Sequence, residues 1–210
     1  MTAPAPPGLR PDLAPIVGMI EPGSRVLDIG CGDGELLEYL VHRRQVTGRG
    51  MEIVQEGVNA CVARGLSVIQ GDADTDLSDY PTAAFDYVVL TFTLQATRDP
   101  RQVLAEMLRI GRYGIVSITN YAYWPLRLGL LLRGQMPTAE VDGVAWHASG
   151  NIRRCTIVDF ETLGAELGLS VDRRIGLGRR HPDGRLPEVR CLPNLRACQA
   201  IYLLHRDPGS

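Results

Sequence analysis

The sequence contains no lysine, no long apolar run and no excess of positive charge. All 22 basic residues are arginines, and 24 acidic residues bring the net charge to −2. A duplex-binding domain is normally more basic, so we expect no nucleic-acid partner. The longest apolar segment, Trp124–Leu132, is interrupted by Arg127, whereas a membrane-spanning helix needs about 20 apolar residues. We therefore expect no membrane span.

Closely paired cysteines and metal-spaced histidines are also missing. The five cysteines are an odd number and include no Cys-x-x-Cys pair, which argues against a disulfide framework and a zinc ribbon. His42, His181 and His205 have no partner at ligand spacing, so we expect no metal site. Because Met1–Pro7 lacks the apolar stretch of a signal peptide, we expect a cytoplasmic protein.

The charge is unevenly distributed along the chain. Residues 1–110 carry 9 arginines and 15 acidic residues, a net charge of −6, whereas residues 111–210 carry 13 arginines and 9 acidic residues, a net charge of +4. The basic half suits an acidic partner or an anionic substrate, although solvated surface arginines give the same composition.

Apolar strands alternate with amphipathic helices along most of the chain. Strands are expected at Arg25–Ile29, Val46–Ile53, Leu66–Ile69, Phe85–Leu90, Gly114–Thr119, Ser170–Leu177 and Ala200–His205. Such alternation predicts a single doubly wound, mainly parallel α/β sheet with helices on both faces. We expect seven strands, the last of them antiparallel in a hairpin around residues 178–196. The chain divides into a flexible arm at 1–10 and one domain at 11–206, with an insertion or cap at about 120–155.

A glycine-rich turn follows the first strand. In Asp28-Ile29-Gly30-Cys31-Gly32-Asp33-Gly34 the glycines allow a ligand to approach the backbone. Asp28 at the end of the strand would repel a pyrophosphate, which disfavours a nicotinamide dinucleotide. It suits a cationic ligand such as the amino-acid part of S-adenosylmethionine. Cys31 is interpreted as a small residue that fits between glycines, because a nucleophile would need a histidine partner and none is adjacent.

Two further acids follow the next two strands. Glu52 stands 24 residues after Asp28, near the offset of about 20 residues at which an acid accepts ribose hydroxyls. Asp72 follows the third strand, where a carboxylate can accept the exocyclic amine of adenine. Each acid alone is typical of a solvated loop. Together they line the crevice at the carboxyl ends of parallel strands, where open α/β sheets bind ligands, and they predict a nucleoside site.

No catalytic group is assigned by these patterns. Methyl transfer from a sulfonium needs mainly alignment, and a base is required only for an acceptor that is protonated at neutral pH. The side chains that could face the methyl group are Thr91, Gln95, Asn120, Tyr121, Tyr123 and His147. The apolar segment Trp124–Leu132 is either a cap over the ligand pocket or an exposed patch for a partner.

Longer stretches carry a family resemblance. Val26–Gly34, Glu52, Asp72 and Phe85–Leu90 resemble the class I S-adenosylmethionine-dependent methyltransferases, a Rossmann-like fold. The segments Gly50–Glu52, Val58–Asp74, Leu94–Pro100 and Leu130–Pro137 are similar to the MetW family of methionine biosynthesis. This similarity extends from about Leu9 to Arg206.

The resemblance implies a class I methyltransferase fold, S-adenosylmethionine or S-adenosylhomocysteine as ligand, and a partnership with homoserine O-acyltransferase, which activates homoserine early in methionine synthesis. An S-adenosylmethionine-dependent methyltransferase acting on a small molecule is the alternative. The expected cofactor-binding residues are Asp28, Gly30, Cys31, Gly32, Glu52, Ile53, Asp72, Ala73 and Gln95.

The substrate-facing segment departs from the family pattern. Ile118-Thr119-Asn120 stands where the family has Phe-Pro-Asn, and Trp146–Arg153 replaces a Trp-Tyr-Asp-Thr-Pro-Asn-Ile-His run. Tyr123 stands where the family has a histidine. The nucleoside end is therefore expected to be intact while the segment facing a substrate or partner has changed.

Overall fold

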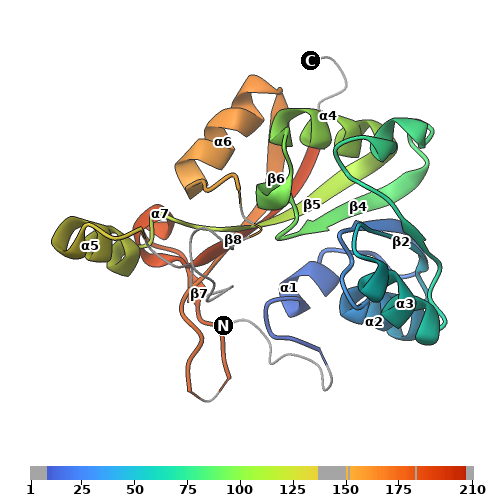
Figure 1. The fold of residues 1–210 in the computed structure, drawn as a ribbon, viewed down its shortest axis with the longest axis horizontal. Helices are drawn as coiled ribbons and strands as arrows, with labels where there is room; N and C mark the ends of the chain where they lie inside the picture. Colours follow the sequence, from blue (N-terminus) through green and yellow to red (C-terminus); the bar gives the residue numbers. More distant parts are fainter. Residues whose placement is uncertain (1–8, 137–149, 151, 183, 207–210) are drawn as a thin grey trace.

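The computed structural model describes residues 9–136, 150, 152–182 and 184–206 (Figure 1). Its helices are α1 (Ala14–Val17), α2 (Glu35–Arg44), α3 (Gln55–Ala63), α4 (Pro100–Ile110), α5 (Trp124–Arg133), α6 (Ile157–Glu166) and α7 (Pro193–Arg196), with 3-10 turns η1 (Asp76–Asp79) and η2 (Leu94–Ala96). The strands are β1 (Arg25–Ile29), β2 (Thr47–Glu52), β3 (Val68–Gln70), β4 (Phe85–Thr91), β5 (Gly111–Thr119), β6 (Leu169–Leu177), β7 (Glu188–Val189) and β8 (Gln199–Arg206).

The described strands form a single sheet in the order β3-β2-β1-β4-β5-β8-β6-β7. Strands β1 to β5 pair in parallel, and β8 is antiparallel to both β5 and β6. The predicted fold class and the antiparallel last strand are confirmed. The count of seven is corrected to eight strands, because the two-residue strand β7 pairs with β6 from within the expected loop. Two residues are too short to show an alternating pattern.

The hairpin of β6 and β8 also forms at one end of the sheet, where, of the described strands, only the two-residue strand β7 pairs beyond β6. Leu177 and Gln199 are register partners across this hairpin. On its other side β8 pairs with β5, with Thr119 opposite Gln199. The strand that comes last along the chain therefore joins the parallel half of the sheet to β6.

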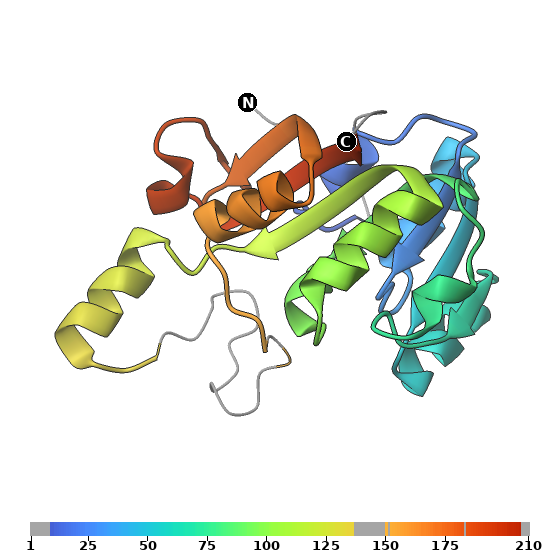
Figure 2. The same ribbon diagram turned by 90° about the horizontal axis from the view of Figure 1, so that it is seen from above.

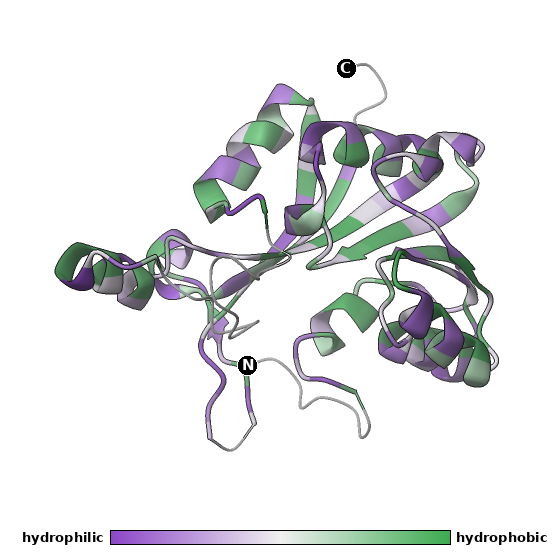
Figure 3. Cartoon of the chain, in the orientation of Figure 1, coloured by the Kyte–Doolittle hydropathy of each residue, from purple (hydrophilic) through white to green (hydrophobic). Residues whose placement is uncertain are grey.

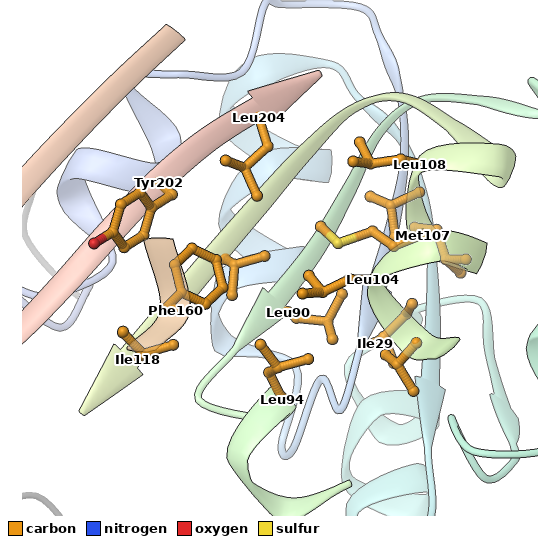
Figure 4. Packing of buried hydrophobic residues seen from close by; sticks show 14 of the residues in the cluster. Ile29, Leu90, Leu94, Leu104, Met107, Leu108, Ile118, Phe160, Tyr202 and Leu204 are labelled. Carbon is orange, nitrogen blue, oxygen red and sulfur yellow. The ribbon is translucent and has the colours of Figure 1, made fainter. Parts of the chain in front are cut away.

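Both faces of the sheet are covered, which explains the near-continuous apolar strands. Figure 1 shows α4 and α6 on one side of the sheet and α1, α2 and α3 on the other. Side chains alternate along β1, so that Leu27 lies in the core under α4 and α6 while Val26 lies in the core under α1 and α2. Figure 4 shows the first core, where the rings of Phe160 and Tyr202 lie 4.5 Å apart.

Local capping fixes where the helices of the first core begin. Pro100 begins α4, and the preceding Asp99 accepts a hydrogen bond from the Gln102 N–H. At α6, Thr156 and Asp159 form a reciprocal capping box. These side chains satisfy N–H groups that have no partner within the helix.

The predicted arm and insertion are described only in part. Residues 1–8 and 137–149 lie outside the described residues, whereas Leu9 is buried in the core under α1 and α2. None of the helices that the structure describes has both the length and the apolarity to cross a membrane.

Candidate functional site

The candidate site lies where the strand order reverses. From β1 the chain proceeds outward to β2 and β3, and it then returns to the other side of β1 to form β4 and β5. Because these five strands are parallel, their carboxyl ends meet at one edge of the sheet. Open α/β sheets bind ligands in the crevice at such a point. Asp28, the glycine turn, Glu52 and Asp72 all lie at this edge.

The glycine turn is shaped by left-handed backbone. Gly30 has φ +71° and Gly32 has φ +58°, values that residues with a Cβ rarely adopt. A Cβ on Gly30 would collide with the side chain of Thr93, whereas a Cβ on Gly32 would meet nothing within 4 Å. Gly30 is therefore required for internal packing. The side of Gly32 on which a Cβ would stand faces open space, where a ligand can approach.

Asp28 is a buried carboxylate, and one of its oxygens has no partner among the described residues. Its exposed fraction is 1%, and no described group donates a hydrogen bond to its Oδ1. Burial raises the pKa of Asp28 to about 7, and the negative charge of Glu52 adds to this effect. An unsatisfied polar atom in the interior is costly and rare in native proteins. The position suits a ligand that brings a positive charge or a hydrogen-bond donor.

Glu52 connects the glycine turn to the end of β2. Its Oε2 accepts the Gly32 N–H at 2.8 Å and its Oε1 accepts the Val54 N–H at 2.9 Å. Because each carboxylate oxygen can accept more than one bond, Glu52 retains acceptor capacity while its orientation is fixed. This arrangement suits the recognition of paired hydroxyl groups.

Asp72 is held by both its own loop and a cation. Its Oδ1 accepts the Asp74 N–H at 2.9 Å, and its Oδ2 accepts a hydrogen bond from Arg98 Nη2 at 2.7 Å. The Arg98 N–H also donates to the Asp74 carboxylate at 2.9 Å. Arg98 thus connects the loop after β3 to the loop after β4.

The other predicted cofactor-binding residues have different surroundings. Ile53 is mostly exposed beside Glu52, while Ala73 is half-buried against the core. Cys31 Sγ lies 3.8 Å from Cys61 Sγ. Burial raises the pKa of the Cys31 thiol, and the charge of Asp28 raises it further. A thiol that stays protonated is a poor nucleophile, which favours the packing interpretation of Cys31.

Gln95 is buried among protein groups at the end of β5. Its Oε1 accepts the Thr119 N–H at 2.7 Å, and its Nε2 donates to the Thr119 carbonyl at 3.0 Å. The family pattern has proline at the position of Thr119, and proline has no N–H to donate. The departure of this sequence therefore adds a hydrogen bond. A contact between Gln95 and a ligand stays a prediction.

Several catalytic candidates have structural contacts. Asn120 donates to the carbonyls of Asn194 and Ala197 and accepts the N–H groups of Ala122 and Ile157. The Tyr121 ring lies beneath Arg154, Tyr123 is buried, and His147 lies outside the described residues.

Thr91 differs from these residues because its Oγ1 is buried without a described partner. The Oγ1 of Thr119 is in the same situation. They lie at the carboxyl ends of β4 and β5. Within the described residues, no group of three or more His, Cys, Asp or Glu side chains is arranged to hold a metal ion.

Two residues of the site escaped the sequence patterns. Thr93 covers Gly30 and donates its hydroxyl hydrogen to the Ile29 carbonyl at 3.0 Å. In the sequence analysis Arg98 appeared only within Leu94–Pro100, a segment that is similar to the MetW family, and no role was predicted for it. Each residue contacts a segment far away along the chain, Thr93 the end of β1 and Arg98 the loop after β3. No periodic pattern in the sequence predicts such contacts.

Solved structures define the class of this fold. The chain superposes on an S-adenosylmethionine-dependent methyltransferase of Thermotoga maritima, described as a possible histamine N-methyltransferase, with a TM-score of 0.70 at 19% identity over 94% of this chain and 88% of that one. An S-adenosylmethionine-dependent methyltransferase of Archaeoglobus fulgidus gives a TM-score of 0.64 at 17% identity over 92% and 90%. The chain has the fold of the class I methyltransferases.

Sequence similarity identifies the family within this class. The family model described as methionine biosynthesis protein MetW matches residues 10–204. The chain is 36% identical to the bifunctional methionine biosynthesis protein MetXA/MetW of Rhodopirellula baltica, over 95% of this chain and 33% of that protein. The chain belongs to the MetW family of methionine biosynthesis proteins, and it spans about a third of the length of this relative.

Proposed function

We propose that the crevice at the ends of β1, β2 and β3 binds S-adenosylmethionine or S-adenosylhomocysteine. The observation that carries this proposal is the buried Asp28 Oδ1, which has no described partner. The amino group of the ligand supplies a cationic donor for this oxygen. The open backbone at Gly32 leaves room for the amino-acid part. Glu52 accepts ribose hydroxyls, and Asp72 accepts the adenine amine.

Calorimetry with each nucleoside tests this site. Asp28→Asn preserves the size of the side chain and removes its charge, so binding falls by roughly tenfold or more, as expected for loss of a charge-assisted hydrogen bond. Asp33→Asn is the matched control, because Asp33 lies in the same turn but is exposed and pairs with Arg64 at 2.8 Å. NADH binding without a response to either adenosyl compound would contradict the proposal.

We further propose that the protein is an accessory partner of homoserine O-acyltransferase. The support is the relative that carries MetXA and MetW in one chain. Ligand binding that alters affinity for the partner must be matched by an equal effect of the partner on ligand affinity. Such linkage lets a downstream product of methionine synthesis adjust an early step. The test measures acyltransferase rate with and without this protein across an S-adenosylmethionine titration. An unchanged rate with no complex would exclude the accessory role.

A small-molecule methyltransferase is the second candidate. It is favoured by the hydroxyls of Thr91 and Thr119, which have no partner among the described residues. They lie on adjacent strands and offer donors and acceptors to a polar acceptor molecule. Transfer of a labelled methyl group to a defined small acceptor, lost in a Thr91→Val variant, would establish this activity instead.

A further inference from the structure

Helix α5 presents apolar side chains that no other element among the described residues covers. None of its ten residues, all of them described, is buried. Leu131 is 80% exposed and Leu132 is 73% exposed. Figures 1 and 2 show α5 extending away from the sheet, and Figure 3 shows its largely hydrophobic colouring at the left of the view. An exposed apolar cluster of this kind marks an interaction site in soluble proteins.

The exposed side chains follow the spacing of a recognition helix. Trp124, Leu128, Leu131 and Leu132 occur at positions i, i+4, i+7 and i+8 and form one stripe, which we call the α5 stripe. Amphipathic helices that dock into an apolar groove use anchors at these positions. The geometry of α5 therefore suits a partner with a groove rather than a flat polar surface.

The helix is held in place at its beginning and ends at a left-handed glycine. Ala122 and Tyr123, directly before it, are buried. Arg127 Nε donates to the Ala122 carbonyl at 2.5 Å, and Pro125 lies in the first turn. At the far end Gly134 adopts φ +64° and ends the helix. A preformed helix loses less conformational entropy on binding than a segment that must fold.

The charges on α5 select the kind of partner. The helix carries Arg127 and Arg133 and no acidic residue, and the second half of the chain has a net charge of +4. A symmetric dimer in which the α5 helices of two copies pack together would place their arginines against each other. A partner with acidic residues around its apolar groove would instead be electrostatically complementary.

The place of α5 in the chain links this surface to the nucleoside crevice. Helix α5 follows β5 after four residues, so it leaves the sheet at the edge where the glycine turn lies. We infer that the α5 stripe is the surface by which this protein binds the acyltransferase, through an apolar groove with an acidic rim on that enzyme. This inference rests on the proposed partnership with the acyltransferase.

The test uses the full chain and the purified acyltransferase of the same organism. Leu128→Asp and Leu131→Asp place a charge in the stripe, and each is expected to weaken the complex by about thirtyfold or more, the size of effect seen for interface anchors. Val62→Asp is the matched control, because Val62 is 57% exposed near the end of α3. Arg133→Glu is expected to weaken binding most at low salt. Equal binding of S-adenosylhomocysteine by all variants shows that they are folded.

The possible failures are distinguishable. If the wild-type protein binds the acyltransferase and both stripe variants bind it equally well, the inference is overturned while the partnership stands. If the wild-type protein does not bind the enzyme, the partnership and this inference both fall. A wild-type dimer that Leu131→Asp converts into monomers would assign the stripe to a second copy and overturn the inference.

Discussion

Arg98 Nη2 lies 2.7 Å from Asp72 Oδ2, so the carboxylate proposed to accept the adenine amine already holds a cation. A charged donor binds a carboxylate more strongly than a neutral amine does, so Arg98 would compete with an adenine amine that binds at Asp72. Arg98 is 71% exposed in its side chain, and an exposed ion pair contributes about 0–1 kcal/mol. Arg98→Ala is expected to tighten S-adenosylhomocysteine binding by up to about fivefold, measured by calorimetry.

The control ligand is S-inosylhomocysteine, which carries a carbonyl in place of the exocyclic amine. Arg98 can donate to this carbonyl, so Arg98→Ala is expected to weaken its binding. Weaker binding of both ligands would instead identify Arg98 as a residue that positions Asp72.

The raised pKa of Asp28 predicts a pH-dependent affinity. Burial and the charge of Glu52 raise its pKa to about 7, and only the ionised form attracts the amino group of the ligand. S-adenosylhomocysteine binding should therefore strengthen as the pH rises from about 5 to about 7 and then level off until the amino group of the ligand itself begins to lose its proton. At pH values below the pKa the affinity falls by about tenfold per unit. Asp28→Asn should remove this dependence on pH. A wild-type affinity that does not change with pH would contradict the prediction.

The Asp28 carboxyl group also makes the stability of the ligand-free protein depend on pH, but in the opposite direction. Its pKa is 3.8 in an unperturbed chain and about 7 in the fold, so the folded state binds this proton more tightly. The free energy of unfolding therefore decreases between pH 4 and pH 7 and then levels off. The difference in the free energy of unfolding between wild-type protein and Asp28→Asn, measured by thermal unfolding at each pH, isolates this contribution. A difference that is flat over this range would show that Asp28 is already ionised in the fold.

Gly32 and Gly23 form a matched pair. Both have positive φ, +58° and +75°, and a Cβ on either meets nothing within 4 Å. Alanine at each position should cost about 1–2 kcal/mol of stability from backbone strain. Only Gly32→Ala should also weaken nucleoside binding, because Gly32 lies at the crevice and Gly23 does not. Equal binding by the two variants would place the ligand elsewhere.

Asn120 is predicted to stabilise the fold rather than to act on a substrate. Its side chain makes four hydrogen bonds at the meeting point of β5, α6 and α7. Asn120→Ala should lower the free energy of unfolding by about 2–4 kcal/mol, because buried polar groups lose their partners. Asn59→Ala, on the exposed face of α3, should change it by less than about 0.5 kcal/mol. Urea denaturation measures both.

The placement of the three acidic residues at one edge of the sheet could be predicted from the sequence, because each one stands at or just after the end of a strand. Asp28, Glu52 and Asp72 stand at or just after the ends of β1, β2 and β3, and parallel pairing brings these ends together. Arg98 reaches the same site from a loop after a different strand. Its contribution depends on the path of that loop, which no local pattern encodes.

Other features depended on long-range packing. The sequence did not decide whether Trp124–Leu132 is a cap or an exposed patch, because the residue pattern of an apolar segment is the same in both cases. The contacts of Gln95 and Asn120 with residues far along the chain were equally invisible. Strand β7 was missed because its two residues acquire strand geometry only through pairing with β6.

The position of β8 has a consequence during synthesis. The parallel strands are complete at Thr119, yet the strand that pairs with β5 begins about 80 residues later, at Gln199. At a translation rate of about 5–20 residues per second, the apolar edge of β5 stays open for about 4–16 seconds. Unpaired strand edges promote aggregation. The nascent chain is thus expected to need shielding by the ribosome or a chaperone until Gln199–Arg206 emerges.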